Sequence, residues 1–150
     1  MLIIDTNIMS SGIIFATIAA IAFGFWTVLH QQAADKINYL FGAIIVSLTA
    51  VIVGLIFLLP NIKTTNLFSN PKGILFLVLA GICALAIDYF ALKAYGSGLA
   101  ISITGPIIIG GSIAVAVLIG FFLGESITLV KIVGLLFVII GSGILATVGK

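Results

Sequence analysis

The amino-acid sequence predicts an all-α integral membrane protein, a bundle of five transmembrane helices with almost no soluble part. Composition is the first reason. Of the 150 residues, 63% are hydrophobic and only 7% are charged, whereas soluble domains are about 25% charged. The second reason is that the apolar residues gather in five windows. Each window is long enough to cross a bilayer core of about 30 Å, which takes roughly 20 residues of helix.

We treat residues 1–150 as a single transmembrane domain. In lipid a backbone has to satisfy its own hydrogen bonds, so the windows are expected to be helices. The connections between them are short, which makes consecutive helices antiparallel neighbours. The five predicted helices span residues 12–30, 39–59, 73–95, 99–123 and 129–148.

The few charges exclude some partners and suggest how the chain reaches the membrane. A net charge of +2 without a clustered basic face argues against nucleic-acid binding. Residues 1–11 contain Asp5 and no basic residue, so we expect no cleaved signal peptide and take the first helix as the targeting signal. The main expected partner is the lipid bilayer.

The lysines do not favour one orientation in the membrane. Positive residues normally gather on the cytoplasmic side. With five spans, the face that holds the N-terminus and the opposite face each receive three lysines, respectively Lys63, Lys72 and Lys131, and Lys36, Lys93 and Lys150. Two interpretations stay open. Either other factors fix the topology, or copies insert in both orientations and pair antiparallel, as inverted repeats do in many transporters.

The C-terminal half carries a specific series of motifs. Tyr89–Gly98 reads YFALKAYGSG, Pro106 lies near the start of a long apolar helix, and Leu123–Thr128 reads LGESIT. Gly134 and Gly141 follow in the last helix. This series resembles the EamA-like domain of the drug/metabolite transporter superfamily, and the resemblance extends more loosely over the whole chain.

The resemblance implies a small-molecule transporter, usually an exporter, that works by alternating access. Most members of the family join two such domains in one chain, and this chain is similar to the shorter, five-helix half-units. It is also distantly similar to four-helix multidrug transporters that are antiparallel dimers. We therefore expect a homodimer, with an antiparallel arrangement as one alternative.

Asp88 is the main candidate for a functional residue. It lies about seven residues from the end of its predicted helix, or roughly 10 Å from that membrane surface. Ionisable residues at such depth usually face a cavity or a partner. The functional interpretation is a proton or cation site; the structural one is a hydrogen bond to a neighbouring helix.

Trp26 is the second candidate, because it shares a helix face with Phe23 and His30. Such a face can bind a cationic or apolar solute or simply pack. We expect His30 itself to lie at the membrane boundary.

Tyr89, Ser102 and Pro106 complete the candidate substrate-binding or coupling residues. Pro106 either kinks a helix that is already under way at Leu99, or lies in the first turn of a helix that starts near Gly105. A broken helix marks the binding site in many transporters.

Four glycines and one glutamate are expected to be structural. Gly120 and Gly124 form one small-residue ridge and Gly134 and Gly141 another, and such ridges allow helices to approach closely in membranes. One ridge is expected to contact the second subunit. Glu125 is expected to cap the fifth helix by accepting from its free backbone N–H groups.

The sequence thus predicts a transporter, expected to be an exporter, of a small metabolite or a cationic or apolar solute, in a prokaryotic inner (plasma) membrane. An enzyme is not expected, because the spans contain no set of catalytic or metal-binding residues, and no cofactor or metal is predicted. The alternative is a non-transporting membrane subunit, or half of a heterodimer with an opposite-topology partner.

Overall fold

Five helices make up the fold. The computed structural model describes residues 6–64, 70–126 and 128–148, so Ile127 of the LGESIT motif and Lys150 lie outside the described residues. The helices are α1 (Thr6–Ala34), α2 (Tyr39–Leu58), α3 (Pro71–Tyr95), α4 (Ile101–Phe122) and α5 (Leu129–Val148), and a 3-10 turn, η1 (Leu59–Asn61), extends α2. All five are long and apolar enough to cross a membrane, and the described residues contain no strand. The predicted fold class is confirmed.

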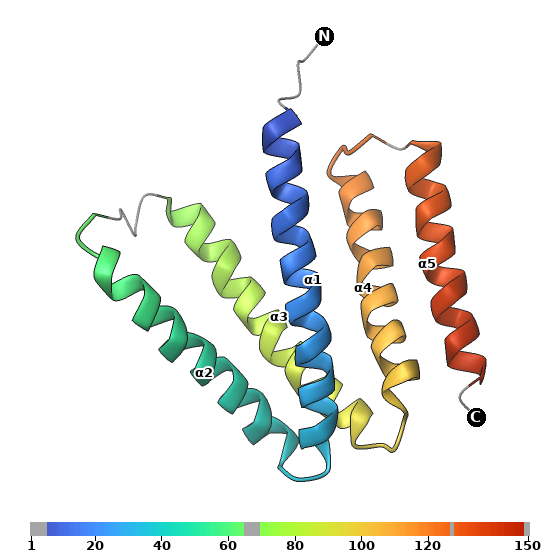
Figure 1. The fold of residues 1–150 in the computed structure, drawn as a ribbon, viewed down its shortest axis with the longest axis horizontal. Helices are drawn as coiled ribbons and strands as arrows, with labels where there is room; N and C mark the ends of the chain where they lie inside the picture. The colour runs from blue at the N-terminus through green and yellow to red at the C-terminus, as the bar shows by residue number, and fades with distance from the viewer. Residues whose placement is uncertain (1–5, 65–69, 127, 149–150) are drawn as a thin grey trace.

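The helices form two antiparallel hairpins with α1 between them (Figure 1). The α2–α3 hairpin and the α4–α5 hairpin each have extensive internal packing. They diverge from the end of the molecule where α3 connects to α4. Helix α1 packs mainly on α3 and over a shorter stretch on α4. The start of α1 and the end of α5 lie at opposite ends of the bundle (Figure 1).

The core is confined to the end where the hairpins converge. Its buried members are Ala34, Ala91, Leu92 and Tyr95. Elsewhere the helices expose most of their apolar side chains, and at most 17% of any span is buried within the chain. Lipid can cover such a surface without the cost that water would impose, so the single chain stays open.

Two helix ends differ from the prediction in ways that affect the site. Helix α1 continues to Ala34, one turn past the predicted end at His30, because Gln31 and Gln32 extend the helix instead of ending it. Helix α4 begins at Ile101 and contains Pro106 in its interior. The alternative in which this helix starts near Gly105 is therefore wrong. Because Pro106 has no N–H, the Ser102 carbonyl lacks its helical donor.

The LGESIT turn ends α4 with a hydrogen-bonded C-cap. The Glu125 N–H donates to the Gly120 carbonyl at 2.9 Å and the Gly124 N–H donates to the Phe121 carbonyl at 3.1 Å, which is the Schellman pattern. Gly124 has φ +91°, a conformation that suits glycine. Gly124 thus closes the helix end and does not belong to a packing ridge.

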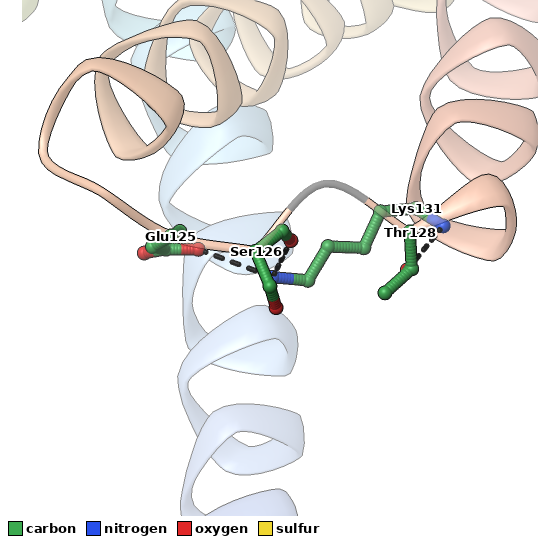
Figure 2. Close-up of polar contacts among 4 residues, drawn as sticks. All are labelled: Glu125, Ser126, Thr128 and Lys131. Atoms are coloured by element: carbon green, nitrogen blue, oxygen red, sulfur yellow. Dashed lines mark hydrogen bonds and ion pairs between the residues drawn. The ribbon is translucent and has the colours of Figure 1, made fainter.

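The other end of the same turn starts α5. Figure 2 shows Glu125 paired with Lys131, whose Nζ lies 3.3 Å from Oε2. The Lys131 backbone N–H donates to the Thr128 hydroxyl oxygen at 3.3 Å, so Thr128 provides the described side-chain cap. The expectation that Glu125 caps α5 is not met by the described contacts; its carboxylate lies against Gly120 and Lys131 instead.

The close approach of α4 and α5 depends on Gly110. A Cβ at this buried position would collide with Ser142 of α5 and lie 3.6 Å from Val138. Its neighbour Gly111 has open space around it, as do Gly134 and Gly141. The two α5 glycines are exposed, so they do not make a close helix contact within the described chain.

We predict that Gly124→Ala lowers the free energy of unfolding by about 1–2 kcal/mol, the cost of a left-handed residue with a side chain. Denaturation of the purified protein in mixed micelles measures it. Gly54→Ala is the matched control, because Gly54 lies in the interior of α2 with nothing near its Cβ position. Equal effects of the two substitutions would refute the role of the turn.

We also predict that Gly110→Ala destabilises the chain by about 1–3 kcal/mol, a typical cost of overpacking. The adjacent Gly111→Ala is expected to cost nothing, since its added methyl meets open space. The same denaturation assay compares them. A stable Gly110→Ala variant would show that the α4–α5 contact adapts without loss.

Candidate functional site

Two ionisable side chains from different helices meet inside the membrane-spanning region. His30 Nε2 of α1 lies 3.3 Å from Asp88 Oδ1 of α3, and the two residues are only 5% and 6% exposed. Because α1 ends at Ala34, His30 lies a turn inside its helix, and Asp88 lies seven residues before the end of α3. The sequence predicts His30 at the membrane boundary; the structure buries its side chain between α1 and α3. His30 is the partner that the sequence left unassigned for Asp88.

An aromatic stack holds His30 in place. The Trp26 and His30 rings lie with centroids 3.8 Å apart, and Phe23 stacks on the other side of Trp26 at 4.9 Å. The spacing of these residues along α1 produces this order directly, since positions three and four apart share a helix face. His30 Nδ1 also lies 3.0 Å from the Trp26 carbonyl oxygen. Contacts within α1 therefore orient the imidazole independently of Asp88.

A cavity of about 370 Å³ opens beside this stack, between α1 and α2. Trp26 and His30 form its polar and aromatic wall, and Leu92 closes it from α3. The remaining wall is almost wholly apolar; its other residues are Leu29, Ala33, Ile37, Gly42, Ile45, Val46 and Thr49. Asp88 does not line the cavity, so His30 stands between the cavity and the carboxylate.

A second, wider groove lies between α1, α4 and α5. Pro106 lines it together with Gly24, Thr27, Gly110 and Ser142. The lining of this groove is mainly apolar, with the Thr27 and Ser142 hydroxyls as its polar side-chain groups. The buried Thr27 hydroxyl donates to the Phe23 carbonyl at 2.8 Å. The groove lies on the side of α1 that packs toward α4, so Pro106 belongs to a different hollow from the one that Trp26 lines.

The structure brings together only part of the predicted site. Asp88 and Trp26 both lie around His30, as described above. Tyr89 is half-buried beside Asn38, Tyr39 and Leu40, in a separate surface hollow. Ser102 is exposed near the start of α4. These two residues contact neither the stack nor the first cavity.

Sequence reasoning missed three buried polar groups besides the pairing of His30. Among the described residues, His30 Nε2, the Tyr95 hydroxyl and the Thr104 hydroxyl are buried without a hydrogen-bond partner. Thr27 lies close by, because a Cβ at Gly105 would be 3.6 Å from its methyl group. Hydroxyls are common in membrane helices, so the sequence offered no signal that these were buried. Together they make the meeting point of α1, α3 and α4 unusually polar for a membrane interior.

This arrangement is suited to binding a solute. The described residues contain no group of three or more His, Cys, Asp or Glu side chains that could hold a metal ion. The acid and the imidazole can each take up or release a proton, and the aromatic face of Trp26 is suited to a cation or an apolar ring. A carboxylate buried in this setting is costly unless it is paired.

The family of the chain follows from comparison with known proteins. No curated protein and no solved structure matches the sequence. The family model described as the EamA-like transporter family matches residues 10–147, which is nearly the whole chain, and five helices are consistent with a single half-unit. This family lies within the drug/metabolite transporter superfamily, as the LGESIT turn and the glycines after it suggested. The chain belongs to the EamA-like transporter family.

Proposed function

We propose that this chain is half of a dimeric transporter that exports a small metabolite or a cationic or apolar solute from a prokaryotic cell by alternating access. The observation that carries the proposal is the buried His30–Asp88 pair beside a cavity walled by Trp26. An ionisable pair at this depth is expensive for a purely structural membrane protein. Beside an apolar cavity it is well placed to recognise a solute in transit.

The open shape of the chain supports a dimer. The hairpins diverge (Figure 1), and at most 17% of any described span is buried within the chain. In lipid, helices associate through close packing of small residues, and no hydrophobic force drives them together. Gly134 and Gly141 on α5 are exposed and have open space at their Cβ positions. We propose that this face of α5 contacts the second subunit.

The proposed dimer is antiparallel. The order of spans in the sequence assigns three lysines to each face of the membrane, so the charges favour neither orientation. In an inverted pair, the cavities of the two copies would open toward opposite sides of the membrane. That is the symmetry on which alternating access depends in transporters with inverted repeats. Three further residues remain candidate substrate contacts: Tyr89, Ser102 and Pro106. They would reach the substrate either from the second copy or from the groove beside α4.

The alternative is a non-transporting subunit, in which Asp88 would pair with a cationic residue of a partner helix. The contact between Asp88 and His30 weighs against it, because the carboxylate already has a partner within its own chain. The same contact is also consistent with a heterodimer, in which this chain pairs with a related chain that inserts in the opposite orientation. Topology measurements separate these cases.

We predict that the purified chain, reconstituted in vesicles, accumulates at least one solute from a panel of amino acids, nucleobases and small organic cations. Trp26→Ala is expected to reduce the initial uptake rate at least tenfold, because it removes the aromatic wall of the cavity. Phe25→Ala is the matched control. Phe25 is the adjacent aromatic residue on α1 and is 68% exposed. Uptake equal to that of protein-free vesicles for the whole panel would refute the transport function.

For topology, we predict that single cysteines introduced by Thr64→Cys or Ser97→Cys are both labelled from outside whole cells in comparable fractions. The two positions lie at opposite ends of the bundle, after α2 and after α3. Cys83→Ala removes the native thiol first. Labelling of only one position would establish a fixed orientation, and the antiparallel homodimer would then be replaced by a heterodimer or a parallel assembly.

A further inference from the structure

One close contact between α2 and α3 narrows the cavity that Trp26 and His30 line. Gly42 of α2 is buried, and a Cβ at this position would lie 2.8 Å from Leu92 Cδ1 and 3.3 Å from Ile37 Cγ2. Atoms do not approach a Cβ that closely, so any side chain at position 42 has to displace Leu92. Gly42, Leu92 and Ile37 all line the cavity. The room that Gly42 leaves therefore belongs directly to the cavity.

The backbone around this contact is held in place on both helices. The side chain of Asn38 caps the start of α2 by accepting hydrogen bonds from the first backbone N–H groups of the helix. A second glycine lies at the end of α3, where a Cβ at Gly96 would be 2.9 Å from Cε1 of Tyr39. A methyl group added at Gly42 is therefore expected to displace the flexible end of the Leu92 side chain and not the two helices.

The cavity is the space into which Leu92 can move. Its side chain is 2% exposed and packs in the small core with Ala91 and Tyr95. These neighbours resist displacement, because protein interiors are close-packed and contain few voids larger than a water molecule. The side of Leu92 that faces the cavity has no such resistance. A larger residue at position 42 thus reduces the cavity twice, by its own volume and by the leucine end that it pushes inward.

The size and the lining of the cavity make this reduction important. Its volume of about 370 Å³ lies near the lower end of the range for small-molecule pockets, about 300–1,000 Å³. The wall is almost wholly apolar, with polar side-chain atoms from Trp26, His30 and Thr49. A solute that fits it has an apolar body and few polar groups, so selection can act on the size of the body. An oversized body costs binding energy as overpacking does in a protein core.

We propose that Gly42 and Leu92 together set the largest apolar body that this cavity accepts, which makes Gly42 a specificity-determining residue. This inference rests on the transport function proposed above and narrows its substrate class to apolar solutes below a size limit. Gly42 acts through the room that it leaves, and the end of Leu92 is the movable part of the wall. Two substitutions change the limit in opposite directions: Gly42→Ala adds a methyl group against Leu92 Cδ1, and Leu92→Val removes that atom.

Aryl methanols of increasing size measure the limit. Benzyl alcohol, naphthylmethanol and anthrylmethanol share one neutral polar group, and each step adds one rigid ring. His30 lines the cavity and is the single histidine of the sequence, so it reports their binding. The full chain with isotope-labelled histidine is placed in lipid nanodiscs, and the NMR signals of the imidazole are followed as each alcohol is added. A change that saturates gives Kd, whereas partition into the lipid gives a change that does not saturate.

The variants are expected to change the order of affinities. Gly42→Ala should raise the Kd of naphthylmethanol at least about tenfold and leave that of benzyl alcohol within about twofold of the native value. Leu92→Val should lower the Kd of anthrylmethanol at least about fivefold. The double variant is expected to bind the series as the native chain does. Gly54→Ala is the matched control, because it adds the same methyl to α2 in open space, and it should leave all three Kd values unchanged.

A purely structural role of Gly42 predicts a different pattern. Gly42→Ala would then weaken the binding of all three alcohols by the same factor, and Leu92→Val would not restore it. Either result overturns the inference, as does a native chain in which no alcohol shifts the His30 signals. If Gly42→Ala does not fold, Leu92→Val decides alone. Tighter binding of anthrylmethanol relative to benzyl alcohol then supports the size limit, and unchanged relative affinities overturn it.

Vesicle uptake separates failure of this inference from failure of the proposed function. The solute panel described above is measured with the native chain and with the same variants. Uptake of panel solutes by a chain whose alcohol binding does not depend on Gly42 overturns the inference and leaves the transport function in place. Alcohol binding with the expected size dependence, in a chain that moves no solute, supports the size limit and refutes transport.

Discussion

The membrane interior contains no water to solvate a polar side chain, and this constraint organises the structure. A buried carboxylate needs a partner in protein, and Asp88 of α3 finds His30 of α1 at 3.3 Å. The imidazole in turn bonds to the backbone of its own helix, as the Thr27 hydroxyl does one turn earlier. This contact lies where α1 crosses α3, at the end of the bundle that also contains the small core. The buried core of the described chain and the crossing of α1 over α3 therefore lie at the same end of the bundle as the His30–Asp88 contact.

Away from that contact, packing depends on small residues. Lipid chains are as apolar as leucine, so two membrane helices gain little by burying large side chains against each other. The α4–α5 hairpin is close because Gly110 admits Ser142, and its turn is tight because Gly124 accepts a positive φ. Elsewhere the hairpins separate and leave glycines of α5 uncovered.

The proposed function depends on the geometry around the His30–Asp88 contact. A carboxylate in direct contact with the cavity would hold a cation tightly. Here His30 is interposed, and it is clamped by Trp26 on one face and by Asp88 at its edge. A solute in the cavity would therefore contact His30 and Trp26 first, with the carboxylate behind them.

The sequence alone determined the membrane fold and the helix-ending turn, because both depend on local properties. Five apolar windows are sufficient to predict five spans, and the polar LGESIT break is visible after the fourth of them. The positive φ of Gly124, which the sequence predicted to lie in a packing ridge, came only from the structure. The sequence also singled out Asp88 and Trp26, since a deep carboxylate and an aromatic stripe are visible in the order of residues.

Only the tertiary structure decided that His30 is the partner of Asp88. The two are 58 positions apart in sequence, and the prediction ended α1 at His30 because glutamines follow it. The structure likewise separated Tyr89, Ser102 and Pro106 from that cluster and assigned close packing to Gly110. Which faces of the helices meet depends on how the hairpins cross, and no spacing along one helix encodes that crossing.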